Sequence, residues 1–136
     1  MCDQDTHRLR AKRMSGGWYR YCLTDGVDEG LPGIYEWAVE GAGIYIGKYT
    51  GIDRPKLRYG QNVARMLAGL PYHIKSNPTG YRRIHHALKA AHLEGRRITL
   101  TILENVSPEK LHAREAELIA QRGELNDPPF GRRLLT

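Results

Sequence analysis

Two tyrosines and a lysine that could take part in acid–base chemistry lie within one short segment, GIYEWAVEGAGIYIGK (33–48). The tripeptide Gly-Ile-Tyr occurs twice in it, so that Tyr35 and Tyr45 are ten residues apart and Lys48 follows closely. A phenol can exchange a proton with a substrate, and an ammonium can hold an anion. Tyrosines are also ordinary packing residues of strands, so the segment by itself leaves both roles open.

A carboxylate occupies a position where an apolar residue is expected, on a helix predicted over 107–123. The core-facing stripe of this helix consists of Leu111, Glu115, Leu118 and Ile119. A buried carboxylate without a partner is unfavourable. The partner of Glu115 is either Arg122 or Arg58, in a structural ion pair, or a divalent cation, which prefers oxygen ligands. The helical pattern leaves these alternatives open.

The net charge of +6 is unevenly distributed along the 136 residues. Residues 1–53 carry 6 basic and 8 acidic side chains, whereas residues 54–136 carry 15 basic and 7 acidic ones. Clustered Lys and Arg displace counterions from phosphates, so a nucleic acid is the expected partner. Cys2 and Cys22 predict no disulfide framework, and no signal peptide or membrane span is evident, so a cytoplasmic protein without a membrane partner is expected.

Periodicity and turn residues predict a short N-terminal extension followed by one domain. The extension, 1–30, is expected to be partly disordered or to hold one short strand, at 18–23, and the domain is expected to span 31–136. In the domain, we expect strands at 33–39, 44–49 and 98–104 and helices at 56–69, 81–95 and 107–123. This β-β-α-α-β-α order indicates an α/β (α+β) fold, with a small sheet flanked by helices.

Taken together, these positions resemble the GIY-YIG nuclease family, from Gly33 to Asn126 and in the family's order. The matching motifs are Gly33-Ile34-Tyr35, Tyr45-Ile46-Gly47 with Lys48, Arg58 on the next helix, Glu115 with Ile119, and Leu125-Asn126. The resemblance implies a central three-stranded antiparallel sheet of GIY-YIG type.

The resemblance also implies a DNA endonuclease that hydrolyses phosphodiester bonds with Mg²⁺ or Mn²⁺ and without a small-molecule cofactor. Glu115 would be the metal ligand and Arg58 would hold the phosphate. Tyr35, relayed through Lys48, would be the general base, although a free tyrosine titrates near ~10 and needs nearby positive charge. Tyr45 would orient water or phosphate, and Asn126 would brace the site.

One position departs from the family pattern. One turn past the arginine, members carry His or Tyr, but this chain has Asn62. Tyr59 or His73 could take over that role, or the role is lost. The departure motivates an alternative function, a catalytically weak or inactive DNA-binding module of the same fold. A third alternative is a structural or interaction protein with a basic surface.

The length of the hairpin loop tests whether Tyr35 and Tyr45 lie at one site. The family places both tyrosines together, and side chains alternate between the faces of a strand. An even loop would put Tyr35 and Tyr45 on opposite faces, whereas the odd loop GAG, with Glu40 opposite Ile44, puts them on one face. We therefore predict an odd loop.

The helix at 81–95 is expected to contact nucleic acid through the face opposite Ile84 and Leu88. The candidate residues on or just after this helix are Arg82, Arg83, His86, Lys89, Arg96 and Arg97, and His85 and His92 are expected on the same face. The alternative is an ordinary solvated face. The histidines have no i, i+4 spacing, which argues against zinc.

Overall fold

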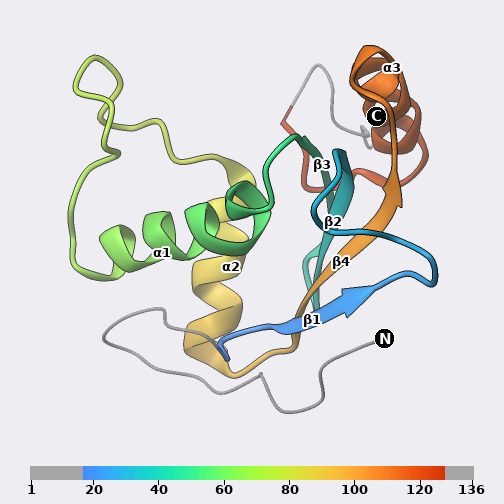
Figure 1. Cartoon of the computed structure of the whole chain (residues 1–136). Helices are drawn as coiled ribbons and strands as arrows, with labels where there is room; N and C mark the ends of the chain where they lie inside the picture. Colours follow the sequence, from blue (N-terminus) through green and yellow to red (C-terminus); the bar gives the residue numbers. More distant parts are fainter. Residues whose placement is uncertain (1–16, 128–136) are drawn as a thin grey trace.

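The computed structural model describes residues 17–127 of the chain, which form an α+β fold (Figure 1). The strands are β1 (Arg20–Leu23), β2 (Gly33–Val39), β3 (Gly43–Tyr49) and β4 (Ile98–Asn105). The helical elements are a π-helical turn, η1 (Arg54–Arg58), and the α-helices α1 (Tyr59–Leu67), α2 (Arg83–Glu94) and α3 (Pro108–Arg122). The expected α+β class is confirmed.

The three expected strands pair antiparallel as predicted, but the sheet has one more strand than expected, and this strand is parallel to its neighbour. The sheet has four strands in the order β1-β4-β2-β3. β2 is antiparallel to β3 and to β4, whereas β1 is parallel to β4. A parallel pair is not joined by a tight turn, so the sequence between two parallel strands does not reveal their pairing.

The short strand expected in the N-terminal extension is present as β1, but it is an edge strand of the central sheet. Next to it, the ring of Trp18 stacks on Trp37 of β2, with ring centroids 5.5 Å apart. Cys22 of β1 is disulfide-bonded, contrary to the expectation of no disulfide. The rest of the expected extension, 1–16, and the end of the expected domain, 128–136, lie outside the described residues.

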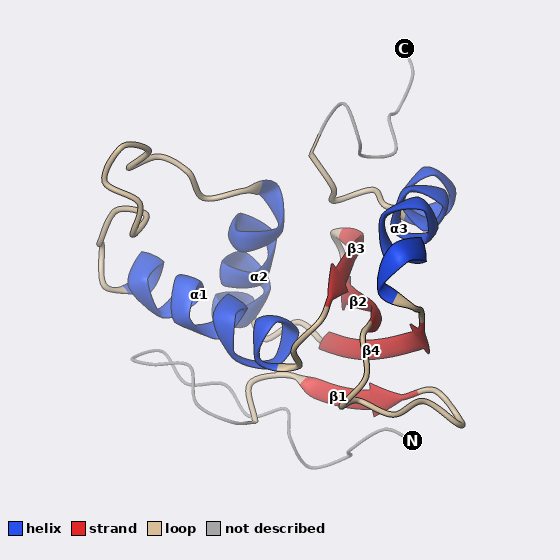
Figure 2. Cartoon of the chain, turned by 45° about the horizontal axis from the view of Figure 1, so that its top comes forward, coloured by secondary structure: helices blue, strands red, loops and turns tan. Residues whose placement is uncertain are grey.

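Alternation along the strands gives the sheet two cores, one on each face. Tyr35 and Trp37 of β2 lie in the core that includes Leu88 of α2. Ile34 and Ile46 lie in the second core, with residues of α3. Figure 2 shows α1 and α2 on one side of the sheet and α3 on the other. Because β3 is an edge strand, side chains from both faces can meet around its edge.

The prediction of an odd hairpin loop is confirmed. Val39 lies opposite Gly43 and Tyr35 opposite Gly47, so Tyr35 and Tyr45 share a face of the sheet. The loop comprises residues 40–42 and is therefore one residue earlier than expected. Gly41 and Gly43 have φ angles of 81° and 131°, in the region that favours glycine, and this explains the position of the turn.

Candidate active site

Three tyrosines form the centre of the candidate site. The hydroxyls of Tyr35 and Tyr59 are hydrogen-bonded at 2.5 Å, and the rings of Tyr35 and Tyr45 have centroids 6.4 Å apart. The Tyr59 ring lies edge-on to both of the others. Two of the tyrosines come from the hairpin and the third from the start of α1, so packing of this helix on the sheet completes the cluster.

The glycine of the second motif half makes room for this cluster. A Cβ atom on Gly47 would overlap the phenol of Tyr35, which lies directly across from it on β2. The ring of Tyr35 therefore covers the bare backbone of β3. This close approach gives a physical reason for glycine at the end of the Tyr-Ile-Gly sequence.

Replacing Gly47 by alanine is expected to displace the Tyr35 ring and to destabilise the fold. Overpacking of this kind lowers the free energy of unfolding by about 1–3 kcal/mol. Urea unfolding measures the effect. The matched control is Gly51→Ala, because a Cβ atom there has no neighbour within 4 Å. Equal stability of the two variants would contradict the packing described here.

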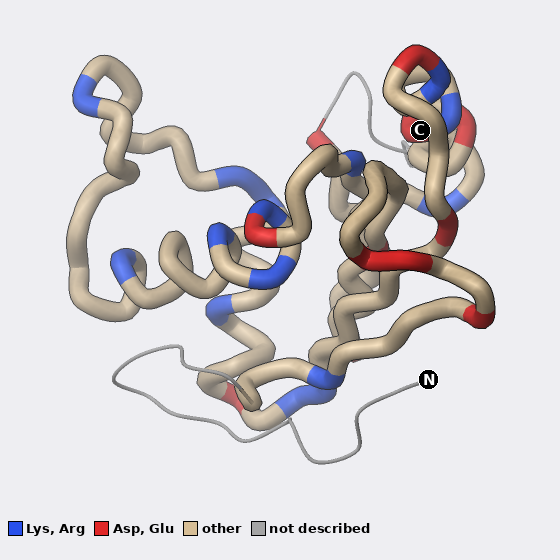
Figure 3. The backbone as a smooth tube through the Cα atoms, viewed as in Figure 1, with Lys and Arg blue, Asp and Glu red and all other residues tan. Residues whose placement is uncertain are grey.

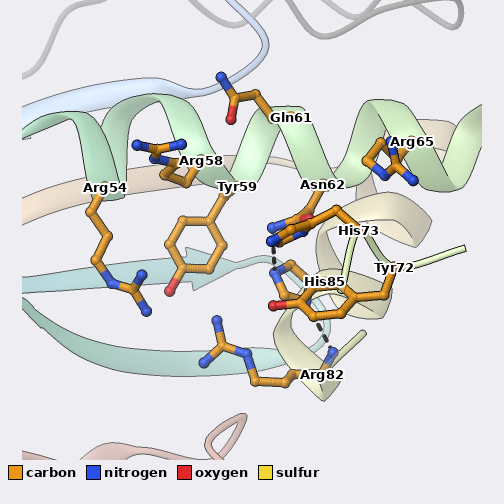
Figure 4. Close-up of a pocket in the computed structure, with 10 residues that line it drawn as sticks. All are labelled: Arg54, Arg58, Tyr59, Gln61, Asn62, Arg65, Tyr72, His73, Arg82 and His85. Atoms are coloured by element: carbon orange, nitrogen blue, oxygen red, sulfur yellow. Dashed lines mark hydrogen bonds between the residues drawn. The ribbon is translucent and has the colours of Figure 1, made fainter. Parts of the chain in front are cut away.

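The arginine at the site differs from the one predicted. A cavity of about 450 Å³ is lined by Tyr35, Tyr45, Lys48, Arg54, Arg82 and Glu115, among other residues. Arg58, the predicted phosphate ligand, does not line this cavity and has an exposed side chain. Figure 4 shows Arg54 and Arg82 extending toward the hydroxyl end of Tyr59, with Arg58 directed elsewhere.

The π-helical turn explains this difference. An α-helix brings residues i and i+4 together, whereas a π-helix brings i and i+5 together. Arg54 is the first residue of η1, and Tyr59, five residues later, directly follows its end. Tyr59 thus lies one turn past Arg54. Asn62 lies instead near His85, with Nδ2 of Asn62 3.4 Å from Nε2 of His85.

Arg82 approaches the cluster from α2. Its Nη1 donates a hydrogen bond of 2.7 Å to the hydroxyl of Tyr45. The sequence predicted that Arg82 contacts nucleic acid on the surface, but it did not place Arg82 near the tyrosines. No sequence pattern indicates that the start of α2 packs near β3. Its guanidinium lies instead within the candidate site.

Glu115 is paired with Lys48 across the edge of β3. Nζ of Lys48 lies 3.1 Å from Oε1 of Glu115, and the glutamate side chain is 17% exposed. The expected ion-pair partners, Arg122 and Arg58, are both wrong: Arg122 binds Glu36 at 2.6 Å and Arg58 does not line the Glu115 cavity. Within residues 17–127, no other hydrogen bond engages this carboxylate, so Oε2 retains its capacity to bind a cation.

The predicted metal ligand therefore fits a site with one protein carboxylate. Within the described part of the chain, no group of three or more His, Cys, Asp and Glu residues could hold a metal ion. Mg²⁺ commonly keeps several waters and binds one or two carboxylates together with substrate phosphates. Glu115 opens onto two cavities, one shared with Tyr35 and one shared with Asn126, which leaves room for such ligands.

Asn126 holds the outer edge of β3, in keeping with a bracing role. Its side-chain Oδ1 accepts a hydrogen bond of 3.0 Å from the N–H of Ile46, and its Nδ2 donates one of 2.9 Å to the Ile46 carbonyl. The neighbouring Leu125 N–H donates to the carbonyl of Ile44 at 2.8 Å. The side-chain amide of Asn126 thus binds the backbone of Ile46, the residue between Tyr45 and Gly47, and so positions β3.

The residues predicted to bind nucleic acid do not form one continuous face. Arg83 donates to the carbonyls of Glu124 and Asn126, and Arg96 binds the side chain of Glu94 and the carbonyl of Glu40. His86 and Arg97 are exposed and Lys89 is partly buried. His85 and His92, expected on the polar face, are buried. Figure 3 shows Lys and Arg positions along η1, in α1 and at the start of α2.

The environment of the tyrosines opposes their ionisation. Tyr35 is 1% exposed, and its burial, reinforced by Tyr45, raises the pKa of its phenol above the usual value of 10.0, against the smaller influences of Tyr59, Arg54 and Arg82. Burial likewise raises the pKa values of Tyr45 and Tyr59. The protein alone therefore holds Tyr35 protonated at neutral pH.

A pH–rate profile is the measurement that follows from these raised pKa values. A base with a raised pKa is mostly protonated at neutral pH, so its active form increases about tenfold per pH unit. For a reaction in which Tyr35 is the general base, we expect the rate to rise across the neutral range without a plateau, and Tyr35→Phe to remove that rise. A rate that is constant from neutral pH upward would exclude Tyr35 as the base.

Comparison of the chain with protein-family models, curated proteins and solved structures finds no match. Among residues 17–127, no helix has the length and apolar character required to cross a bilayer.

Proposed function

We propose that this protein is a divalent-metal-dependent DNA endonuclease of the GIY-YIG type. One observation carries the proposal: three tyrosines, a lysine, two arginines and a glutamate, from several separate elements of the fold, line a single cavity of about 450 Å³. Hydrolysis of a phosphodiester requires a proton acceptor for the attacking water, cations for the charge on phosphorus, and neutralisation of the leaving oxygen. The phenols of this cavity can supply the proton acceptor, and its guanidinium groups can supply the cations.

The arginines and the phenol have separate roles in this reaction. The guanidinium groups of Arg54 and Arg82 bind the non-bridging oxygens of the scissile phosphate, where negative charge increases in the transition state. The Tyr35 phenolate takes the proton of the attacking water as the bond from water oxygen to phosphorus forms. The bond to the leaving oxygen breaks, and that oxygen takes a proton from solvent. The hydroxyls of Tyr45 and Tyr59 orient the water and the phosphate.

Glu115 would hold the metal ion. When bound, Mg²⁺ or Mn²⁺ supplies positive charge at the phosphate oxygens. Lys48 orients the Glu115 carboxylate, since its Nζ lies 3.1 Å from Oε1. The charges of Arg54 and Arg82 favour the phenolate of Tyr35, against the larger opposing effect of its burial.

Nicking of supercoiled plasmid tests the proposal. We expect conversion to the open circle by the full chain with Mg²⁺ or Mn²⁺, and none with EDTA. A Glu115→Gln protein purified in the same way controls for a contaminating nuclease. Wild type that is inert with both metals, or as active in EDTA as in Mg²⁺, would contradict the proposal.

The Lys48–Glu115 ion pair favours a second candidate, a DNA-binding module without catalysis, because the ammonium already neutralises the carboxylate. Salt-dependent DNA binding distinguishes the two candidates. Binding that weakens with salt, together with no nicking by wild type, supports the module, and nicking that depends on Glu115 supports the enzyme.

A further inference from the structure

A second cavity adjoins the catalytic one and has a different composition. It has a volume of about 530 Å³ and lies between α1, the connection from α1 to α2, and the start of α2 (Figure 4). Four of the ten residues that line it are arginines, and none is Asp or Glu. Arg54 and Arg82 also line the catalytic cavity, so the two cavities are contiguous.

The arginines of this cavity lack anionic partners. Within residues 17–127, none of Arg54, Arg58 and Arg82 forms an ion pair with a carboxylate. The guanidinium of Arg82 donates to the neutral hydroxyl of Tyr45, and that of Arg65 donates to the carbonyl of Pro71 at 2.8 and 3.2 Å. Guanidinium groups gathered in this way fit phosphate oxygens.

An aromatic side chain forms the opposite wall. The backbone of Tyr72 is held by a hydrogen bond of 3.0 Å from its N–H to the Pro78 carbonyl. Its ring lies edge-on to Tyr81, with centroids 5.4 Å apart, and next to His73, with centroids 4.6 Å apart. Gly80 permits this arrangement, because a Cβ atom there would lie 2.6 Å from the Tyr72 ring. The half-buried ring is thus held in place before any ligand binds.

Polar groups suited to a base edge lie beside this ring. His85 is 1% exposed, and its Nδ1 accepts a hydrogen bond of 2.9 Å from the N–H of Arg82. Burial, followed by the charge of Arg82, lowers the pKa of His85 to about 3, so the imidazole is neutral and carries its proton on Nε2. Nε2 of His85 lies 3.4 Å from the side-chain amide of Asn62, and that amide has both a donor and an acceptor.

From these features we infer that the α1–α2 cavity binds one unpaired nucleotide of the DNA substrate, directly beside the scissile phosphate. Arg58 binds its phosphate, Tyr72 stacks on its base, and Asn62 contacts the base edge. A cavity of 300–1,000 Å³ is the usual size for a small ligand. A base held in a duplex must leave the stack before it can enter such a cavity, so a base that is already unpaired enters at the lowest energetic cost.

This inference rests on the proposed nuclease function and specifies its substrate: DNA with an unpaired nucleotide next to the cleaved bond, as in a bulge, flap or gap. A fully paired duplex would bind the same basic surface through its phosphates alone. The two substrates therefore share the electrostatic contribution to binding and differ in base stacking, which contributes about 1–3 kcal/mol per base.

A binding experiment in EDTA tests the inference without cleavage. The probes are two duplexes of the same sequence, one fully paired and one with a single unpaired 2-aminopurine. We expect the full-length wild type to bind the second duplex about tenfold more tightly, since 1.4 kcal/mol is a factor of ten. We also expect it to quench the 2-aminopurine fluorescence. Tyr72→Ala should abolish both effects and Tyr72→Phe should keep them.

Equal affinity of the wild type for both duplexes without quenching, or a preference that survives Tyr72→Ala, would overturn the inference. The quenching measurement uses wild type alone, so it decides the matter even where a variant fails to fold. Parallel nicking assays in Mg²⁺ separate this inference from the proposed function. Preference without any nicking refutes the enzyme but keeps the nucleotide site, whereas equal nicking of both duplexes refutes the site but keeps the enzyme.

Discussion

Glu115→Gln is expected to nick plasmid DNA about a thousandfold more slowly than wild type, because loss of metal-ion stabilisation amounts to several kcal/mol and each 1.36 kcal/mol is a factor of ten. Glutamine keeps the size of the side chain but removes its charge, so the change tests cation binding rather than packing. Initial rates at saturating Mg²⁺ measure the effect.

The matched control is Glu117→Gln, on the same helix two residues away. Glu117 accepts a hydrogen bond of 3.0 Å from Arg114 on the surface, and exposed pairs of this kind contribute little to stability. Its activity should remain near that of wild type. Similar losses in both variants would indicate that α3 is disturbed, and no loss in either would remove Glu115 from the site.

Arg54→Ala is expected to reduce the rate of nicking by about a hundredfold to a thousandfold, the effect of removing one preorganised donor from a developing oxyanion. The expectation follows from the cavity that Arg54 shares with Tyr35 and Glu115. Single-turnover rates at saturating DNA isolate this chemical step from binding. Arg54→Lys should recover only part of the rate, because lysine lacks the planar fork of donors.

Arg58→Ala is the informative comparison, because the sequence pattern predicts that Arg58, and not Arg54, holds the phosphate. Arg58 lines only the second cavity, so its loss should weaken DNA binding and leave the single-turnover rate within about threefold of wild type. The reverse result, with Arg58→Ala inactive and Arg54→Ala active, would show that the assignment from the π-helical turn is wrong.

Local patterns were sufficient to predict much of the fold. The hairpin follows from two runs of β-branched and aromatic residues around a glycine-containing turn, and α2 ends at Gly95, which has a φ of 73°. The odd loop could be predicted because alternation makes the face of a strand residue depend on parity alone. The same sequence could not place β1, because its partner β4 lies far away in the chain and pairs with it in parallel.

The histidines of α2 show a second limit of sequence patterns. His85 and His92 are polar and occur among basic residues, so the pattern assigns them to the surface. In the structure they are buried, and His85 is held by the N–H of Arg82 and by Asn62. Whether a neutral imidazole can be buried depends on partners from other elements, which a helical pattern does not contain.

The sequence by itself determined which chemistry is available: a hairpin that presents Tyr35 and Tyr45 together, and a glutamate on a core-facing stripe. Only the tertiary structure decided which cations join them. The π-helical turn exchanges Arg58 for Arg54, and the packing of α2 brings in Arg82. The physical reason is that spacing within one strand or helix follows from its own period, whereas proximity between elements depends on how they pack.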